Sequence, residues 1–207
     1  MRKQTIIFDL GGVLVDWNPE YVFLNEFKGD RKKMNWFFKN ICTNEWNEQQ
    51  DGGKLISEAT EERIKLFPKY ENLIKMYYGK WGNMLKGEIN ESVEILKKLK
   101  EMKFNLIALT NWSAETFPVA LKRFDFLKLF SGIVVSGEIQ MLKPFPEIYK
   151  YTLQKYNLNP RECIFIDDRP VNVMGGEKCG IDGIIFETPK KLINSLKKFE
   201  IEISTPT

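Results

Sequence analysis

Three aspartates at the ends of apolar runs are the residues in this sequence most suggestive of chemistry. Asp9 ends the apolar run 5–8, and the pair Asp167 and Asp168 ends a second run at 163–166. Both runs have the length and composition of buried strands. In an open parallel sheet, ligands bind beyond the carboxyl ends of the strands. If both runs belong to one sheet, the three carboxylates converge at one edge.

Carboxylates that lie close together raise one another's pKa and cannot all stay ionised unaided. A cation is therefore expected, and oxygen ligands are those that a hard divalent ion such as Mg²⁺ prefers. The sequence contains no histidine, which excludes Ser-His-Asp systems, histidine-bound zinc and imidazole bases. Any catalysis must use carboxylates, lysine, hydroxyls, backbone dipoles or a metal ion. Carboxylates with a lysine and Mg²⁺ are the groups that enzymes of phosphoryl transfer usually use.

The composition suits a globular protein that acts on a small molecule. The 207 residues fit one domain, or one domain with an insertion, and 43% of them are hydrophobic. The net charge of +3 comes without a basic stripe, so no nucleic-acid or membrane partner is expected. No apolar run approaches the roughly 20 residues that span a bilayer, and no signal-peptide layout is present. The cysteines Cys42, Cys163 and Cys179 lack metal-site spacing and indicate inert thiols, so we expect a cytoplasmic protein.

The order of apolar runs predicts an α/β fold with a doubly wound, Rossmann-like parallel sheet. Buried strands are predicted at residues 5–10, 105–110, 133–136, 163–167 and 183–186. Helical patterns occur at residues 91–102, 114–124, 145–156 and 170–178. Strands that alternate with helices form right-handed βαβ units.

A long segment after the first strand breaks this alternation. It is helix-like and rich in aromatic residues, without a convincing buried strand. A helical cap inserted into the α/β core fits it best. We therefore predict that residues 1–15 and 88–207 form the core and that residues 16–87 form the cap.

Four stretches, taken in order, carry a family resemblance. They are residues 8–14 with Asp9, residues 109–113 with Thr110, residues 141–149 with Lys143, and residues 165–172 with Asp167 and Asp168. This order resembles the haloacid dehalogenase (HAD) superfamily, whose members are mostly phosphatases, and its subfamily I, which has a helical cap after the first motif. Within it, the chain most resembles sugar-phosphate phosphatases whose first motif reads Asp-Leu-Gly.

The resemblance implies a role for each catalytic position. Asp9 would attack phosphorus and form an aspartyl-phosphate, which splits hydrolysis into two easier steps. The hydroxyl of Thr110 and the backbone N–H of Asn111 would hold the phosphoryl oxygens. Lys143 would neutralise the phosphoryl group and the nucleophile as a point charge.

The resemblance also implies a Mg²⁺ site. Asp168 would bind the ion directly, and Asp167 would act through a water or as a second ligand. Asp9 and the backbone carbonyl of Gly11 would complete the protein's contribution. Asn172 has two equal interpretations: it orients Lys143 or a metal-bound water, or it is only a polar residue in the first turn of a helix.

One position departs from the family pattern. The usual motif has a second aspartate, which serves as general acid and base, where this chain has Gly11. General acid–base catalysis typically raises the rate by ~10²–10⁴-fold. Three explanations stay open. The acid comes from elsewhere, with Asp16, Glu45 and Glu48 as candidates; or the substrate has a good leaving group, such as an anomeric or acyl phosphate; or the protein is catalytically weak and uses the fold to bind.

The cap is expected to determine specificity. Trp46 lies in the polar cluster of residues 45–53, and Trp17 and Asn18 lie at the hinge between cap and core. An aromatic ring with neighbouring amides and carboxylates suits a polyol. These residues are predicted to bind substrate; the alternative for Trp46 is a place in the core of the cap.

The predicted function is a Mg²⁺-dependent phosphatase that hydrolyses a small phosphate ester, with sugar phosphates as one candidate class. A response-regulator receiver uses similar residues, but its acidic pair comes early in the chain and it lacks a large insert. A metal-independent 2-haloacid dehalogenase also lacks the second aspartate, yet it would not need both Asp167 and Asp168. A catalytically weak binding protein with this fold is the remaining alternative, and Gly11 alone favours it.

Overall fold

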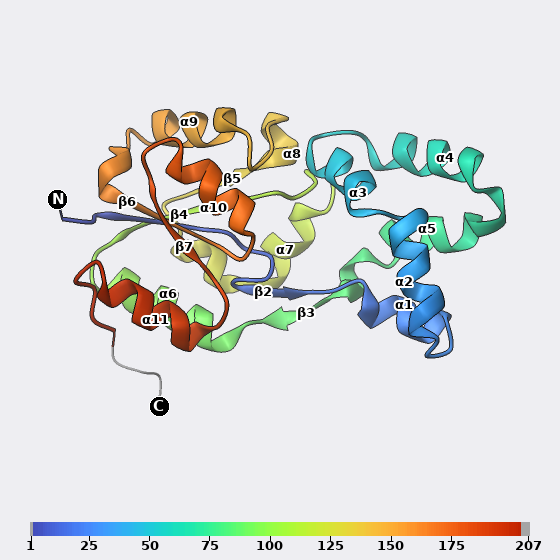
Figure 1. Cartoon of the computed structure of the whole chain (residues 1–207), viewed down its shortest axis with the longest axis horizontal. Helices are drawn as coiled ribbons and strands as arrows, with labels where there is room; N and C mark the ends of the chain where they lie inside the picture. Colours follow the sequence, from blue (N-terminus) through green and yellow to red (C-terminus); the bar gives the residue numbers. More distant parts are fainter. Residues whose placement is uncertain (1, 204–207) are drawn as a thin grey trace.

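The computed structural model describes residues 2–203 and shows two parts side by side along its longest axis (Figure 1). One part is built on a five-stranded parallel sheet, and the other is made of helices. The strands of the sheet are β1 (Thr5–Phe8), β4 (Asn105–Thr110), β5 (Gly132–Val135), β6 (Cys163–Asp167) and β7 (Asp182–Ile185). Each strand predicted from an apolar run is present, and the predicted α/β class is confirmed.

The strand order β5-β4-β1-β6-β7 places β1 in the centre of the sheet. The chain adds β4 and β5 on one side of β1 and then β6 and β7 on the other. This reversal creates a switch point between β1 and β6, which is where ligands bind in such sheets. The register pairs Phe8 with Ile166, so the residues that follow, Asp9 and Asp167, emerge side by side.

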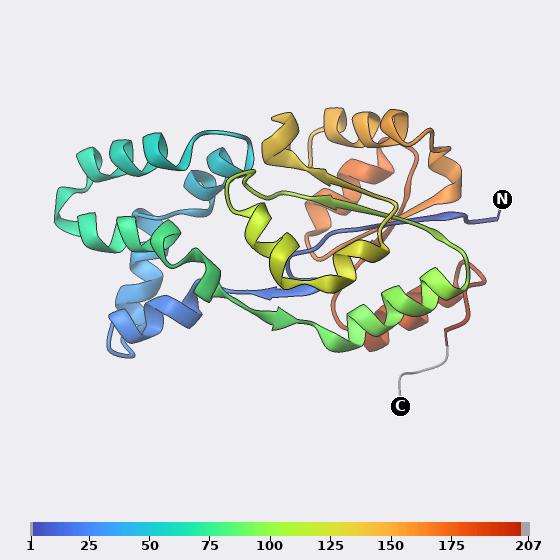
Figure 2. The ribbon, with the colours of Figure 1, turned by 180° about the vertical axis from the view of Figure 1, so that it is seen from behind.

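Helices cover both faces of the sheet (Figures 1 and 2). They are α6 (Asn90–Glu101), α7 (Phe117–Arg123), α8 (Ser136–Ile139), α9 (Pro146–Lys155), α10 (Pro170–Glu177) and α11 (Pro189–Lys197). Side chains of β1 alternate between the faces: Ile6 and Phe8 join the cluster that contains Leu196 of α11, and Ile7 joins the cluster that contains Tyr149 of α9. Both faces are thus buried, which explains why the strands read as continuous apolar runs.

Four of these helices match the predicted patterns, and α8 and α11 were not predicted. The sequence does carry signals for α11. Thr188 caps it, because its Oγ1 accepts a hydrogen bond from the Lys191 N–H at 3.2 Å, and Pro189 occupies the first turn. Leu192 and Leu196 on its inner face are buried.

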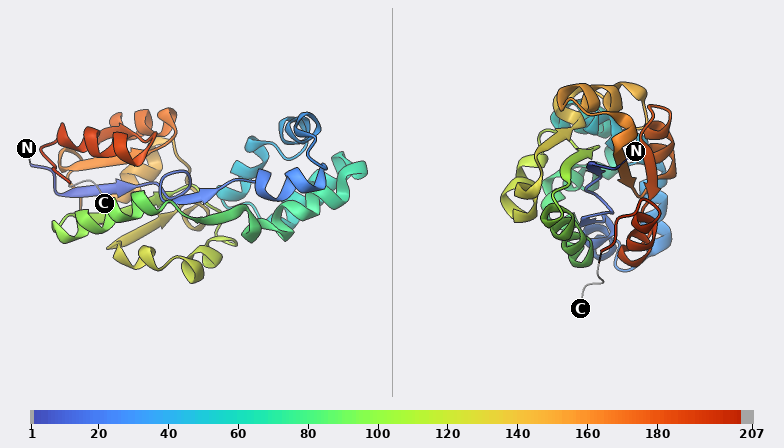
Figure 3. Two further views of the ribbon diagram at one scale, coloured as in Figure 1. Left: turned by 90° about the horizontal axis from the view of Figure 1, so that it is seen from below. Right: turned by 90° about the vertical axis from the view of Figure 1, so that its left-hand side faces the viewer.

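The helical part lies at the end of the sheet (Figure 3). Its helices are α1 (Glu20–Glu26), α2 (Arg31–Asn40), α3 (Asn44–Asp51), α4 (Ile56–Leu66) and α5 (Glu71–Gly79). Short 3₁₀ turns occur at Pro68–Tyr70 and Trp81–Met84 here, and at Asp125–Leu129 and Pro160–Glu162 in the sheet-centred part. Aromatic pairs hold the helices together, and the rings of Phe23 and Phe37 are stacked with centroids 5.4 Å apart. Among residues 2–203, no helix combines the length and the apolar character that crossing a bilayer requires.

Two short antiparallel strands connect the two parts. They are β2 (Val15–Trp17) and β3 (Leu85–Glu88), and they form a separate two-stranded sheet. Neither was predicted, because three or four partly exposed residues carry no clear alternation of apolar and polar side chains. The chain leaves and re-enters the sheet-centred part through this pair of strands, so the pair fixes where the helical part begins and ends.

Candidate active site

The carboxyl ends of β1, β4 and β6 bring the acidic residues together. The backbone N–H of Asp9 donates to the carbonyl of Ile166 at 2.8 Å, which ties the end of β1 to β6. One carboxylate oxygen each from Asp9, Asp167 and Asp168 lies within 4.8 Å of the others. Thr110 ends β4, is buried, and lines the same cavity as Asp9 and Asp168. The structure thus places the three predicted carboxylates at one edge of the sheet.

Lys143 is the buried cation of this cluster. Its Nζ lies 3.0 Å from Asp9 Oδ1 and 2.7 Å from Asp167 Oδ2, and it donates to the carbonyl of Leu109 at 2.9 Å. Burial opposes the charged form, but the two carboxylates outweigh it and raise the pKa of Lys143. Asn111 fixes the lysine's backbone from both sides: its Oδ1 accepts from Lys143 N and its Nδ2 donates to Lys143 O, each at 2.9 Å.

Asp167 is completely buried, and its carboxylate is engaged by protein groups. Besides Lys143, it accepts hydrogen bonds from the backbone N–H of Arg169 at 2.8 Å and from Asn172 Nδ2 at 3.0 and 3.1 Å. Tyr149 in turn fixes the backbone of Asn172, because its hydroxyl donates to the carbonyl of Asn172 at 2.6 Å. Asn172 therefore orients the carboxylate that orients the lysine, which is more than a polar residue on a helix face would do.

Asp168 has a more open environment than Asp167. Its carboxylate reaches over the backbone of Gly12, where a Cβ atom would lie 2.5 Å from Asp168 Oδ2. Gly12 also has a φ of +73°, a conformation that favours glycine. Glycine is therefore required twice at this position, for the turn and for the close approach of the carboxylate. Asp168 is the exposed member of the acidic pair, and it lines the cavity above the cluster.

The charges of the cluster fit a divalent cation. Burial raises the pKa of Asp9 to about 7; Lys143 opposes this shift, and Asp167 and Asp168 add to it. Burial likewise raises the pKa of Asp168, with Asp167 as the next cause. One lysine cannot neutralise three neighbouring carboxylates, and the donor set consists of the oxygens that Mg²⁺ prefers. In addition, the buried Oδ1 of Asn172 has no hydrogen-bond partner within residues 2–203, so the cluster leaves an acceptor for a bound polar group.

A cavity of about 360 Å³ opens above the cluster and lies between the two parts of the chain. The sheet-centred part contributes the residues Asp9, Gly11, Gly12, Thr110, Asn111, Lys143, Asp168, Arg169 and Asn172. From the helical side come Trp17, Asn44, Asn47, Glu48 and Asp51. A smaller pocket of about 80 Å³ adjoins Gly11 and is lined by Trp17, Asn47, Asp51, Trp81, Asn111 and Trp112.

Helix α3 closes this cavity from the side opposite the sheet. Arg169 Nη1 pairs with Glu48 Oε1 at 2.9 Å, and the Ser136 hydroxyl donates to the carbonyl of Asp51 at 2.6 Å. These two contacts join the sheet-centred part to the C-terminal half of α3. A ligand in the cavity would be enclosed between the carboxylates and α3.

The predicted substrate-binding residues differ in where they lie. Trp17 lines both cavities, and Asn111 lines them beside Lys143. Trp46 is buried inside the helical part, where its Nε1 donates to the carbonyl of Ala59 at 3.2 Å, so it occupies the core position that was the alternative. Asn18 accepts from a backbone N–H at the start of α1 and does not line the cavity.

The three candidates for the missing acid also differ in position and in hydrogen-bond partners. Asp16 is engaged on the surface by the hydroxyl of Tyr21, at 2.8 and 2.9 Å. Glu45 is exposed in the first turn of α3 and does not line the cavity. Glu48 lines it, but its carboxylate is paired with Arg169.

Sequence reasoning did not single out Asp51, the carboxylate of α3 that lines both cavities. A signal for it exists. Asp51 is the last residue of α3, where the negative end of the helix dipole disfavours an acid, and no basic residue lies in that turn. A residue that breaks a local rule in this way is expected at functional sites.

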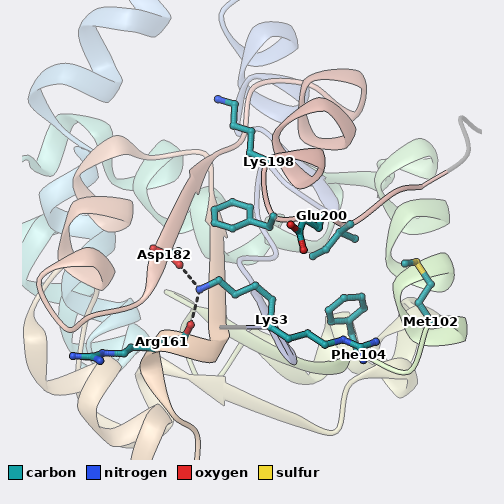
Figure 4. A pocket seen from close by; sticks show the side chains of 10 residues that line it. Lys3, Met102, Phe104, Arg161, Asp182, Lys198 and Glu200 are labelled. Carbon is teal, nitrogen blue, oxygen red and sulfur yellow. Dashed lines mark hydrogen bonds and ion pairs between the residues drawn. The ribbon is translucent and has the colours of Figure 1, made fainter.

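A larger hollow of about 620 Å³ lies at the opposite end of the strands (Figure 4). Its buried cation is already paired: the ammonium of Lys3 pairs with Asp182 and donates to the carbonyl of Arg161 at 2.7 Å. Lys3, Phe104 and Arg161 all precede strands of the sheet, so this hollow is at the amino ends of the strands, whereas ligands bind at the carboxyl ends. We therefore place the active site at the acidic cluster.

Comparison with known proteins agrees with this geometry. The sequence model of the family described as haloacid dehalogenase-like hydrolase matches residues 6–186. The chain belongs to this family. The match spans both the sheet and the helical part, and it confirms the resemblance drawn from the four sequence stretches.

Curated relatives of the chain are named as phosphatases with different substrates. A phosphorylated carbohydrates phosphatase of Thermotoga maritima is 24% identical and covers 87% of this chain and 83% of its own length. A pyrophosphatase of Halalkalibacterium halodurans is 25% identical, with 87% and 82% covered. A sesquiterpene phosphatase of Aspergillus oryzae is 26% identical, with 87% and 88% covered.

Solved structures share the fold. A HAD-family enzyme of Bacteroides thetaiotaomicron superposes with a TM-score of 0.72 at 23% identity and covers 90% of this chain and 95% of its own. The same enzyme in complex with magnesium and inorganic phosphate gives a TM-score of 0.67 at 23% identity, with 89% and 94% covered. These likenesses confirm the α/β fold of the chain.

Proposed function

We propose that this protein is a Mg²⁺-dependent phosphatase that hydrolyses a small phosphate ester through an aspartyl-phosphate on Asp9. The observation that carries the proposal is the contact of the Asp9 carboxylate with the buried Lys143 ammonium, 3.0 Å away, at the floor of a cavity that also contains Asp168. The names of the phosphatase relatives, and the related enzyme that binds magnesium and inorganic phosphate, support the same chemistry.

The first step is attack by Asp9 on phosphorus. Its Oδ1 accepts the backbone N–H of Leu10 at 2.7 Å and contacts Lys143, so we assign the attack to Oδ2, the oxygen that these contacts leave free. As the Oδ2–P bond forms, the bond from phosphorus to the leaving-group oxygen breaks. Water then attacks phosphorus, the Asp9–phosphorus bond breaks, and inorganic phosphate leaves.

The surrounding groups stabilise the charge on the transferring phosphoryl group. Asp9, Asp168 and the carbonyl of Gly11 would hold Mg²⁺, which supplies positive charge against a phosphoryl oxygen when bound. Lys143 provides a fixed positive charge from the protein itself. Thr110, buried at the end of β4, directs a hydroxyl to the same cavity. Such preorganised groups contribute most in a cavity from which water is excluded.

The leaving group would lie toward the helical part. The small pocket beside Gly11 combines three indole rings, Trp17, Trp81 and Trp112, with the amides of Asn47 and Asn111. The indole N–H groups of Trp17 and Trp112 are buried and have no acceptor in the described part of the chain. Ring faces with polar donors suit a hydroxylated group, so sugar phosphates are the first class of substrate to test.

A substrate panel with two product assays tests the proposal against its alternatives. Sugar phosphates, nucleotides, pyrophosphate and terpenyl phosphates are incubated with Mg²⁺ and assayed for inorganic phosphate, and 2-chloropropionate is assayed for chloride. We expect phosphate release from at least one ester and no chloride. Chloride release would identify a dehalogenase instead. Binding of phosphate esters without release of phosphate from any of them would identify a binding protein.

The two members of the acidic pair are expected to respond differently to substitution. Asp168→Ala should raise the Mg²⁺ concentration needed for half-maximal activity with little loss of stability, because Asp168 is exposed. Asp167→Ala should instead lower the free energy of unfolding, by about 3–5 kcal/mol, because it removes one of the two carboxylate partners of the buried Lys143 and the acceptor of Asn172 Nδ2. Mg²⁺ activation curves and urea unfolding of both variants check this. A larger effect of Asp167→Ala on Mg²⁺ activation would reverse the assignment of the two residues.

A further inference from the structure

The position of the missing aspartate opens into a pocket that contains a different carboxyl group. A Cβ atom built on Gly11 would meet no atom within 4 Å, so the space that a side chain would take is open. This space belongs to the pocket of about 80 Å³ between the sheet-centred part and α3. Asp51 supplies the one carboxyl group among the residues described as lining that pocket. It also lines the larger cavity that contains Asp9, so both residues border the same space.

The carboxyl group of Asp51 is held in place by a short chain of hydrogen bonds. Asn47 Nδ2 donates to Asp51 Oδ2 at 2.9 Å, and the hydroxyl of Tyr78 is shared between Asn47 Oδ1 at 3.0 Å and Gln50 Oε1 at 2.8 Å. The backbone of Asp51 is fixed independently, because its carbonyl accepts from the Ser136 hydroxyl. Both the helical part and the sheet-centred part therefore fix where this carboxyl group points. Such fixed geometry is the first requirement of a general acid.

The surroundings of Asp51 favour its protonated form near neutral pH. Burial raises the pKa of Asp51 to about 7; the backbone N–H of Ser113 lowers it, Glu48 raises it and Arg169 lowers it. Glu48 and Arg169 form an ion pair with each other, so their opposite effects largely cancel. A pKa near the working pH lets a carboxyl group both give and take a proton.

Two phenols and one thiol near Asp51 are uncharged near neutral pH. On α5, Tyr77 and Tyr78 face Asp51, and burial raises the pKa of both phenols far above their ordinary value. Behind them, burial raises the pKa of the Cys42 thiol to about 12. On the sheet-centred part, Glu115 interacts with Tyr78 and accepts from a backbone N–H at the start of α4.

We propose that Asp51 donates the proton to the leaving-group oxygen, in place of the aspartate that the family pattern has at Gly11. When the bond from phosphorus to oxygen breaks, its electron pair stays on the oxygen, which takes the Asp51 proton and leaves as an alcohol. The Asp51 carboxylate then accepts a proton from the water that attacks the phosphoryl group on Asp9, which restores its starting form. This inference rests on the proposed phosphatase function.

Replacing Asp51 tests the assignment, because the loss of kcat/KM should depend on the leaving group of the substrate. In Asp51→Asn, kcat/KM for alkyl and sugar phosphates should fall by ~10²–10⁴-fold, because their alkoxide needs a proton. For 4-nitrophenyl phosphate, whose leaving group is stable as an anion, the change should be small. Asp16→Asn is the matched control: it replaces the same kind of side chain near the hinge and should change neither rate. Equal losses on all esters in Asp51→Asn would show a role in binding or folding and would overturn the assignment.

Gly11→Asp provides a second arm, because the structure has room for the side chain. If Asp51 already supplies the proton, Gly11→Asp should add little to the wild type and should restore alkyl phosphate hydrolysis at least tenfold in Asp51→Asn. Equal gains in both backgrounds would show that the wild type has no acid, and the proposal would fail.

A third experiment uses the wild type alone, so it does not depend on whether a variant folds. The ratio of kcat/KM for alkyl phosphates to that for 4-nitrophenyl phosphate should fall as the pH rises through about 7, because Asp51 loses its proton there. A ratio that stays constant would overturn the proposal. If no ester yields phosphate, the phosphatase function itself is wrong; if esters react but these signatures are absent, only the role of Asp51 is wrong.

Discussion

Asp9→Asn should abolish phosphate release, with a loss of about 10⁴-fold or more, the scale on which enzymes respond when a covalent nucleophile is removed. The substitution removes the attacking oxygen's charge but keeps nearly the same shape. The amide can still accept the Leu10 N–H through its remaining oxygen. Near-ultraviolet circular dichroism should therefore be unchanged. Substantial activity in this variant would rule out Asp9 as the nucleophile.

Two further readouts separate the loss of the nucleophile from damage to the site. Beryllium fluoride, which imitates a phosphoryl group on a carboxylate, should raise the melting temperature of the wild type and leave Asp9→Asn unchanged. Without metal, the pH dependence of stability should also differ. The folded-state pKa of Asp9 is raised to about 7 from 3.8, so ionisation of Asp9 lowers wild-type stability as the pH rises through that interval. The melting temperature of Asp9→Asn should fall less between about pH 4 and about pH 7.

Lys143→Met should lower kcat by about 10²–10³-fold, the effect of removing one preorganised charge-stabilising group. Methionine fills a similar volume without the charge, so Asp9 and Asp167 face each other without the cation between them. Stability should fall as well, because breaking a buried ion pair leaves an uncompensated charge, typically at a cost of about 3–5 kcal/mol. Steady-state kinetics and urea unfolding measure the two effects.

Lys3→Met is the matched control for Lys143→Met. Lys3 is also largely buried and ion-paired, with Asp182, but it lies at the amino ends of the strands. The Lys3→Met variant should be less stable than the wild type, while the folded variant keeps the kcat of the wild type. A comparable loss of kcat in Lys3→Met would mean that loss of a buried charge anywhere disturbs the site, and the specific role of Lys143 would not stand.

The sheet and its acidic edge could be predicted because the residues that form them follow local rules. The central strands β1, β4 and β6 are buried on both faces, so their apolar runs are continuous and easy to recognise. Asp9 and Asp167 each follow such a run, and the adjacent register of β1 and β6 then places them together. The chemistry of this edge therefore depends on short stretches of sequence and on one general rule of sheet topology.

The helical side of the cavity could not be predicted in the same way. Asp51 reaches the site only because α3 folds back onto α8, the short helix that follows β5, where Ser136 holds it, 85 positions further along the chain. Trp46 lies one turn earlier on the same helix than Gln50, and both are buried in the helical part. A polar cluster around a tryptophan does not show which of its members face the core and which face the ligand. Packing of the helices decides that, and single-sequence patterns do not contain it.

Dependence of phosphate release on added metal is the most direct test of the central claim. With the best ester from the panel, the rate is measured in Mg²⁺, after addition of excess EDTA, and after Mg²⁺ is restored, for wild type and Asp9→Asn in parallel. The account predicts that the wild type loses activity in EDTA and recovers it with Mg²⁺, and that Asp9→Asn is inactive throughout. Phosphate release that continues undiminished in excess EDTA would contradict it.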